Sequence, residues 1–171
     1  MRLKSKNRTT NGFVLALALI ILVQTLLLVR NYSQSWNGID GFDGAFFSSI
    51  ARNYINYGIV ELKGGQATND GAVANKSEFV FYQHHPPMVP LLTYVSFKLF
   101  GESEGVARLA PIVFTIGSGV ILFTLTRSFF GFVIALLTIF FFASLPMTII
   151  FGRKVGYESP TLFFILLTSY F

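Results

Sequence analysis

The chain has 171 residues, of which 53% are hydrophobic and only 12% are charged, and its formal net charge is +5. Soluble domains carry about 25% charged residues, and their apolar residues form amphipathic stripes. In this chain the apolar residues form long blocks, which excludes an ordinary soluble domain. The absence of cysteine excludes disulfides and thiolate metal sites.

The positive charge is concentrated at the start of the chain, at Arg2, Lys4, Lys6 and Arg8. Basic residues that flank an apolar helix usually mark its cytoplasmic side. The charge therefore predicts an orientation in a membrane, with the N-terminus in the cytoplasm. We expect no nucleic-acid partner.

The first apolar run extends from Phe13 to Val29. The apolar region of a cleaved signal peptide is shorter, about 7–15 residues, and an Ala-x-Ala-like site follows it. No such site follows this run. We therefore predict an uncleaved transmembrane helix over residues 12–30, preceded by a cytoplasmic tail over residues 1–11.

Residues 31–108 contain more acidic than basic residues, and we predict that they form an extracytoplasmic loop with amphipathic juxtamembrane helices. Aromatic and apolar residues at helical spacing predict a helix from Asp43 to Tyr57, which Gly58 ends. Asp43 is the expected N-cap of this helix, because a carboxylate accepts backbone N–H bonds at a helix start.

Two further segments of this loop have a recognisable pattern. Lys63 to Lys76 is rich in Gly, Ala and Asn and is predicted to be a loop. Met88 to Phe100 is apolar but short, and Lys98 interrupts it. Apolar runs of about 10–14 residues are more often interfacial than spanning, so we predict a helix against the outer leaflet.

Residues 109–171 are predicted to hold transmembrane helices 2–4, because three apolar blocks follow one another. The second span covers Leu109 to Thr126, Arg127-Ser128 is the connection, and the third span covers Phe129 to Phe151. Pro160 to Phe171 starts a fourth span but is shorter than the roughly 20 residues that a span needs. We expect the chain to be the N-terminal part of a larger protein.

The predicted fold is thus an all-α polytopic membrane protein with about four transmembrane helices, the last one truncated. Within the second span, Gly117 and Gly119 are expected to serve helix packing. The order of the spans places Glu158 on the outer side with Asp43. It also places Arg153 and Lys154 there, against the positive-inside tendency.

Several polar residues could carry chemistry. In Tyr82-Gln83-His84-His85-Pro86-Pro87 the prolines stiffen the chain after two histidines. These histidines either lie at the interface or contact an anionic headgroup or phosphate. For Arg52 and Arg108 a solvated or snorkelling cation is the default interpretation, and an acid at the position of Glu158 is more often simply solvated.

The order of these features resembles the N-terminal part of C-type glycosyltransferases that use lipid-phosphate sugars, of the protein O-mannosyltransferase and lipid A aminoarabinose transferase type. The resemblance extends from about Gly12 to Phe171 and rests on the order and spacing of its motifs. These are Asp43-Gly44-Ala45-Phe46-Phe47, His84-His85-Pro86-Pro87-Met88, Leu99-Phe100-Gly101, Val106-Ala107-Arg108-Leu109-Ala110-Pro111 and Glu158.

The chain departs from that family pattern in four places. Gly44 stands where an acid is common, His85 stands where Lys is common, Ala110 interrupts an Arg-Leu-Pro string, and Glu158 replaces Asp.

The resemblance implies transfer of a hexosyl or pentosyl group, with inversion, from a polyprenyl-phosphate donor to an acceptor hydroxyl at the extracytoplasmic face. Asp43 would be the general base, within hydrogen-bond reach of the acceptor hydroxyl. Glu158 would orient the acceptor or help to hold a divalent metal, and no organic cofactor is expected. Cationic groups would stabilise the leaving phosphate. The candidates are Arg52, His84, His85 and Arg108.

The expected partners are the lipid bilayer, a lipid-linked sugar donor, and a protein, lipid or glycan acceptor. The expected location is the cell membrane, with several passes, and the chain alone is expected to be inactive. A transporter fragment is one alternative, but it predicts ionisable residues inside the spans, and the predicted spans contain none. A non-catalytic membrane anchor is the other.

Overall fold

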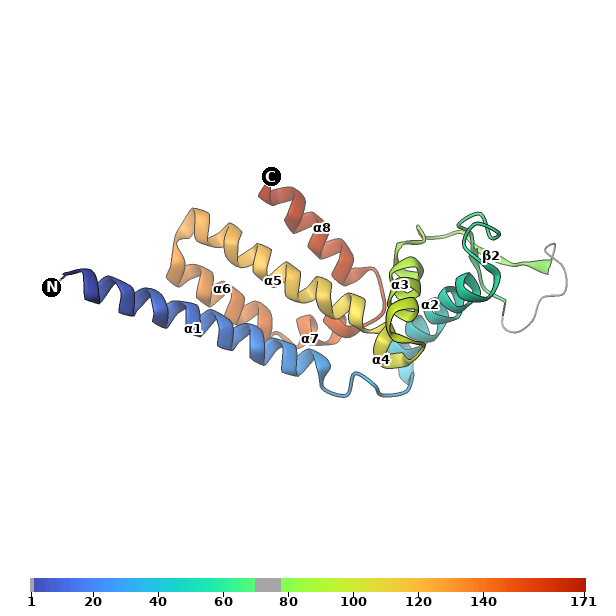
Figure 1. The fold of residues 1–171 in the computed structure, drawn as a ribbon, viewed down its shortest axis with the longest axis horizontal. Helices are drawn as coiled ribbons and strands as arrows, with labels where there is room; N and C mark the ends of the chain where they lie inside the picture. Colours follow the sequence, from blue (N-terminus) through green and yellow to red (C-terminus); the bar gives the residue numbers. More distant parts are fainter. Residues whose placement is uncertain (1, 70–77) are drawn as a thin grey trace. The chain divides into compact units, whose positions relative to one another are not determined.

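The computed structural model describes residues 2–69 and 78–171, apart from the side chains of residues 2–11, 39 and 40. It is mostly helical, which confirms the all-α class (Figure 1). Along the chain the elements are α1 (Arg2–Val29), α2 (Gly38–Tyr57), β1 (Gln66–Ala67), β2 (Phe81–Tyr82), α3 (Met88–Phe100), α4 (Glu104–Ala107), α5 (Leu109–Phe130), α6 (Phe132–Ser144), α7 (Pro146–Arg153) and α8 (Glu158–Tyr170).

The chain divides into two compact units, each with its own packing. The first, which we call the apolar unit, comprises Met1–Arg30, Ile112–Gly152 and Glu158–Phe171. The second, the loop unit, comprises Asn31–Pro111 and Arg153–Tyr157. The loop unit therefore contains all of residues 31–108, together with a short segment from much later in the sequence.

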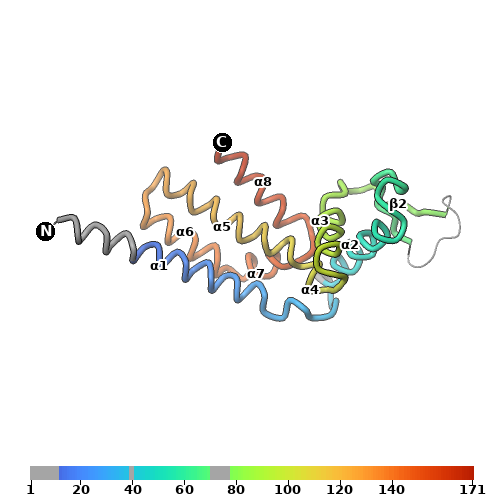
Figure 2. Tube along the Cα trace, in the orientation of Figure 1, coloured from blue at the N-terminus to red at the C-terminus, as the bar shows by residue number. Residues whose placement is uncertain are grey.

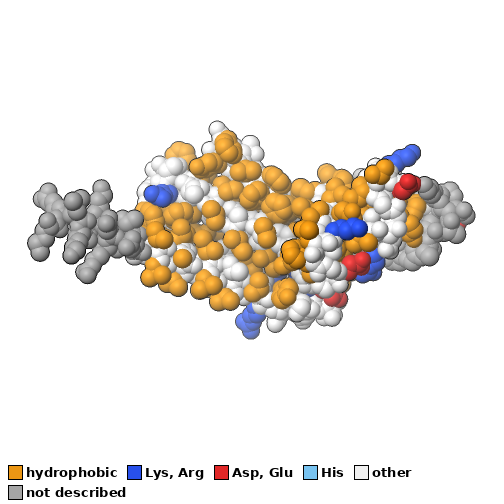
Figure 3. All heavy atoms as spheres, in the orientation of Figure 1, with side chains coloured by type: hydrophobic (Ala, Val, Ile, Leu, Met, Phe, Trp, Pro, Cys, Tyr) orange, Lys and Arg blue, Asp and Glu red, His pale blue; other side chains and the backbone are white. Residues whose placement is uncertain are grey.

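The apolar unit has the character of a membrane-spanning bundle. Within the described residues, Gly12–Val29 and Glu104–Phe130 are helices long and apolar enough to cross a membrane, and the second of them belongs to this unit from Ile112 on. Large hydrophobic side chains such as Leu15, Leu22 and Phe140 are more than half exposed, and Figure 3 shows hydrophobic side chains over the visible face of these helices. In water such a surface would be costly, so the chain is a membrane protein.

The predicted third span is broken, which corrects the sequence interpretation. The helix α5 continues through Arg127-Ser128 to Phe130, and the turn falls at Gly131, whose φ of 82° suits glycine. The apolar block then forms α6 and α7, which meet at 63° (Figure 2). Pro146 begins α7, and because proline lacks an N–H it cannot continue the hydrogen bonding of α6.

Glycines allow close contact between the helices of the apolar unit, as predicted. A Cβ at Gly117 would lie 2.7 Å from Cε2 of Phe163 in α8, and one at Gly119 would lie 2.8 Å from Cδ1 of Ile139 in α6. A larger residue at either position would require the facing side chain or α5 itself to shift.

Gln24 of α1 is the exception to this apolar packing. Its side chain is fully buried, and neither Nε2 nor Oε1 has a hydrogen-bond partner among the described residues. An unpaired buried amide costs about 1–3 kcal/mol. We predict that Gln24→Met, which keeps the shape and removes the polar atoms, raises the midpoint of thermal unfolding in detergent by a few degrees.

The matched control is Thr25→Val on the same helix, because the Thr25 hydroxyl already donates to the Ile21 carbonyl at 2.8 Å. This variant should not raise the midpoint. A lower midpoint for Gln24→Met than for the wild type would show that the Gln24 amide has a stabilising partner.

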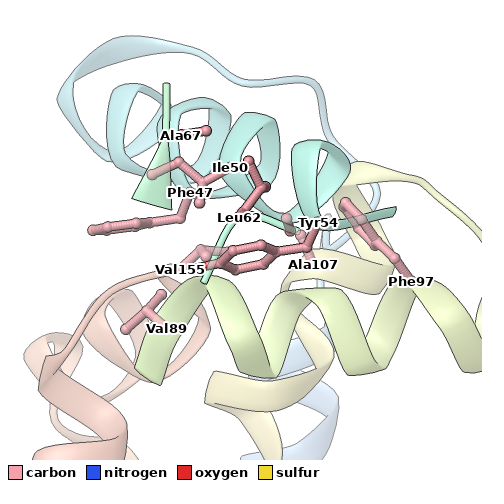
Figure 4. Close-up of a cluster of buried hydrophobic side chains, with 10 residues drawn as sticks. Phe47, Ile50, Tyr54, Leu62, Ala67, Val89, Phe97, Ala107 and Val155 are labelled. Carbon is pink, nitrogen blue, oxygen red and sulfur yellow. The ribbon is translucent and has the colours of Figure 1, made fainter. Parts of the chain in front are cut away.

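The loop unit is built around α2 and α3, which pack against each other. Ile50, Ala51 and Tyr54 of α2 are almost fully buried. They form one cluster with Phe97 of α3 and Val155 of the segment before α8 (Figure 4). The helix α2 ends at Gly58, as predicted, with its N–H bonded to the Tyr54 carbonyl. The helix α3 has the predicted bounds.

The prediction that Asp43 caps α2 is wrong. The helix begins at Gly38, its N-cap is Asn37, and Asp43 therefore lies in the second turn. The early start has a steric basis at Gly41 and Gly44. A Cβ at Gly41 would lie 2.7 Å from the Trp36 carbonyl carbon, and one at Gly44 would overlap the Trp36 ring. The two glycines let the chain before α2 pack tightly on its first turns.

A small hairpin places residues 82–87, which we call the histidine string, next to α2. The strand β1 lies within the predicted loop of residues 63–76 and pairs antiparallel with β2 beyond it, with Gln66 opposite Tyr82. Residues 70–77 lie outside the described part. The buried Asn53 of α2 donates to the Ala67 carbonyl at 2.8 Å, and Gln66 donates to the His85 carbonyl at 2.6 Å. These side-chain bonds join α2 to β1 and β1 to the backbone of His85.

Candidate active site

Asp43 projects from α2 and is paired with a cation that sequence reasoning missed. Lys154 Nζ lies 2.8 Å from Asp43 Oδ2, and the Lys154 side chain is only 11% exposed while that of Asp43 is 36% exposed. A nearly buried ammonium needs a counter-charge. The signal for Lys154 was its predicted place on the outer side, where the positive-inside tendency disfavours a lysine.

The ring of His85 lies between two tyrosines. It stacks on Tyr82 at 5.7 Å between ring centres and on Tyr157 at 4.9 Å, with interplanar angles of 18° and 24°. Tyr82 Oη and His85 Nδ1 are 2.5 Å apart and share a hydrogen bond. The ring of the exposed His84 forms a T-shaped pair with the Tyr82 ring, with 5.3 Å between the ring centres. The stack holds His85 in one orientation.

Two phenylalanines of α2 connect the histidines with Asp43. Phe46 meets Tyr82 edge to face at 5.0 Å, and Phe47 meets Tyr157 in the same manner at 5.5 Å. Such aromatic pairs are worth about 0.5–1.5 kcal/mol each beyond their buried area. The structure therefore gathers Asp43, Lys154 and the histidine string on one side of α2, around four aromatic rings.

Tyr157 also closes the site by a hydrogen bond, because its hydroxyl donates to the Pro86 carbonyl at 2.6 Å. Burial, and to a lesser extent the neighbouring Tyr82 and Tyr54, raises the pKa of Tyr157 to about 12. The phenol thus remains a donor at neutral pH. It ties the segment that carries Lys154 to the histidine string.

The two arginines proposed as phosphate ligands have other contacts. The Nη1 atom of Arg108 donates to the carbonyls of Tyr32 and Gln34 at 2.6 and 2.7 Å. Its guanidinium lies 4.1 Å from the centre of the Trp36 ring. Arg52 Nε is 2.9 Å from Glu102 Oε2. A binding role for Arg52 or Arg108 stays a prediction.

Glu158 belongs to the apolar unit, where it is the first residue of α8 and lines a cavity of ≈ 210 Å³. Two buried hydroxyl groups that line the same cavity form hydrogen bonds with backbone carbonyls at the end of α7. Thr115 Oγ1 lies 3.1 Å from both the Gly152 carbonyl and Ser159 Oγ, and Ser159 donates to the Phe151 carbonyl at 2.8 Å. These bonds satisfy carbonyls that a helix end leaves unpaired. A cavity shared by Glu158 and Asp43 stays a prediction.

In the part of the chain that the structure describes, no three His, Asp or Glu side chains are grouped so that they could hold a metal ion. The divalent metal proposed near Glu158 therefore stays a prediction.

The fold and these side chains define a polytopic helical membrane protein. Its loop unit brings together Asp43, Lys154 and the two histidines. Residues 84–171 match the family of dolichyl-phosphate-mannose-protein mannosyltransferases. The chain belongs to this family of membrane glycosyltransferases. The match begins at the histidine string and includes Glu158, whereas Asp43 precedes it. The chain has no significant match among curated proteins or solved structures.

The raised pKa of Tyr157 gives a test of the site's architecture. Because the pKa of Tyr157 is raised from 10.0 to about 12 in the folded state, the folded protein keeps the phenol proton between pH 10 and about pH 12. The unfolded chain releases that proton in the same pH range. Stability contributed by this phenol is therefore complete below pH 10 and decreases as the pH rises toward 12. We predict that Tyr157→Phe unfolds more easily at neutral pH, by about 0.5–1.5 kcal/mol for one hydrogen bond.

The same variant should lose less stability than the wild type between neutral and strongly alkaline pH, as followed by thermal unfolding. Tyr32→Phe, at a tyrosine that is 41% exposed, is the control and should behave as the wild type. Identical alkaline profiles for Tyr157→Phe and the wild type would contradict this assignment.

Proposed function

We propose that the protein transfers a sugar from a polyprenyl-phosphate donor to an acceptor hydroxyl, with inversion, at the extracytoplasmic face of the cell membrane. The N-terminus would lie in the cytoplasm, as the basic residues before the first span indicate. The observation that carries the proposal is the position of Asp43: its carboxylate is held by Lys154 beside the histidine string, and that string begins the part of the chain that matches the family.

In the proposed reaction, Asp43 takes the proton from the acceptor hydroxyl while the hydroxyl oxygen attacks the anomeric carbon. The bond between the anomeric carbon and the phosphate oxygen breaks, and the polyprenyl phosphate leaves with that electron pair. Because the ion pair engages Oδ2 of Asp43, Oδ1 is the oxygen proposed to accept the proton. Lys154 positions the base and adds positive charge beside it.

The leaving phosphate acquires negative charge, which nearby cations would stabilise. We propose that His84 and His85 supply this contact, because both are exposed. Their tyrosine neighbours pack on Phe46 and Phe47, which place both histidines on the Asp43 side of α2. Glu158 would orient the acceptor or help to hold a divalent metal. Mannose is the first sugar to test, because the family description names it.

The proposal predicts that Asp43→Asn lowers transfer at least 100-fold, since a general base contributes about 10²–10⁴-fold. The measurement is transfer of labelled mannose from a polyprenyl-phosphate donor in membranes that contain the full-length protein. Glu61→Gln, a neutralised exposed acid in the same unit, is the control and should keep its activity. Undiminished transfer by Asp43→Asn would remove Asp43 from the mechanism and favour a non-catalytic membrane protein.

Lys154 should act by positioning Asp43, so that its charge matters more than its bulk. We predict that Lys154→Gln lowers kcat at least tenfold, that Lys154→Arg retains much of the activity, and that KM for the donor changes little. Lys98→Gln, which removes an exposed cation from α3, is the matched control. Equal losses in the Gln and Arg variants, in parallel with their thermal unfolding, would assign Lys154 a purely structural role.

A further inference from the structure

The loop unit contains a second polar site, on the side of α2 that faces away from Asp43. We propose that it binds an uncharged saccharide. A cavity of ≈ 370 Å³ lies between α2, the end of α3 and the start of α4, and its lining includes Trp36, Ser48, Arg52, Phe97, Glu102 and Glu104. This volume lies within the range of about 300–1,000 Å³ typical of ligand pockets.

The position of the cavity separates it from the proposed catalytic residues. Asp43 and Arg52 are nine positions apart on one helix, and at about 100° per residue they point in opposite directions. Phe46 and Phe47 contact the histidine stack on the Asp43 side, whereas Ser48 and Arg52 line the cavity. The saccharide site therefore does not rest on the proposed transfer reaction.

The cavity's charges favour hydroxyl groups over anions. Glu102 and Glu104 supply two carboxylates. Arg52 in the lining and Arg108 behind the Trp36 wall supply two guanidinium groups, so a phosphate would meet no net positive charge. The ion pair between Arg52 Nε and Glu102 Oε2 is 2.9 Å long, and the two side chains are 57% and 36% exposed. A guanidinium beside a carboxylate offers several donors and acceptors to neighbouring hydroxyls of one sugar ring.

Ser48 is the independent sign of a ligand. It lines the cavity and is 6% exposed, and its Oγ has no hydrogen-bond partner in the described part of the chain. Other serines of this region are satisfied locally: Ser49 donates to the Phe46 carbonyl at 2.8 Å, and Ser103 accepts from the Val106 N–H. A buried hydroxyl left without a partner needs an explanation. A rotation of the Ser48 side chain toward the cavity would let the hydroxyl bond to a ligand hydroxyl there.

The aromatic part of the cavity is rigid. The Trp36 ring packs on Gly44, where a Cβ would overlap it, and the Arg108 guanidinium lies 4.1 Å from its centre. Phe97 is 5% exposed and fixed in the core. Aromatic surfaces beside hydrogen-bonding groups suit a sugar, which presents both C–H faces and hydroxyls, and a preformed site avoids ordering losses on binding.

Trp36 also provides the measurement, because the chain has one tryptophan. The protein is placed in lipid nanodiscs free of glycoside detergents and titrated with methyl α-D-mannopyranoside while tryptophan emission is followed. We expect a saturable change, with inorganic phosphate giving none. Ser48→Ala should raise the dissociation constant about tenfold, as expected for one lost hydrogen bond, and it should fold normally because it removes an unpaired group.

Two controls make the result specific. Ser96→Ala changes an equally buried serine on α3 whose hydroxyl already donates to the Leu92 carbonyl at 3.0 Å, and it should bind as the wild type does. Asp43→Asn should also bind as the wild type does, even where it abolishes transfer. The proposal is overturned by an absent or unsaturable signal, by an equal response to phosphate, by unchanged affinity in Ser48→Ala, or by a loss of affinity in Asp43→Asn.

Discussion

The ion pair between Lys154 and Asp43 is the interaction on which the arrangement of the proposed active site depends. Lys154 is only 11% exposed, and an ammonium removed from water is strongly destabilising unless an anion and hydrogen bonds compensate. Asp43 supplies that anion from a distant part of the sequence. The carboxylate proposed to act as the base therefore also holds the segment before α8 in the loop unit, so its two roles are linked.

The same segment is fixed a second time through Tyr157. Its ring packs on Phe47 and His85, and its hydroxyl is bonded to the Pro86 carbonyl. A rigid proline pair on one side and an ion pair on the other leave little freedom between them. Preorganised groups of this kind need no rearrangement when charge develops during a reaction, which is why this side of α2 is the better candidate for catalysis.

The sequence was sufficient wherever a local pattern determines the structure. The apolar run that ends at Val29 predicted the first span, and the apolar segment from Met88 to Phe100 predicted the bounds of α3 correctly. It failed where tertiary contacts decide. The start of α2 depends on the packing of Trp36 on Gly44, and the cation beside Asp43 comes from a loop far along the chain. No periodicity in either segment encodes those contacts.

The contact between Trp36 and Gly44 also accounts for a departure from the family pattern. Glycosyltransferases of the type that this chain resembles often carry an acid directly after the loop aspartate, where Gly44 stands. Any side chain there would overlap the Trp36 ring. An acid at this position and a tryptophan packed on α2 thus exclude each other. Because Trp36 forms one wall of the polar cavity, a side chain at position 44 of this chain would also disturb that wall. The wall of the cavity therefore depends on Gly44, the residue directly after the aspartate proposed to act as the base, although the cavity itself lies on the other side of α2.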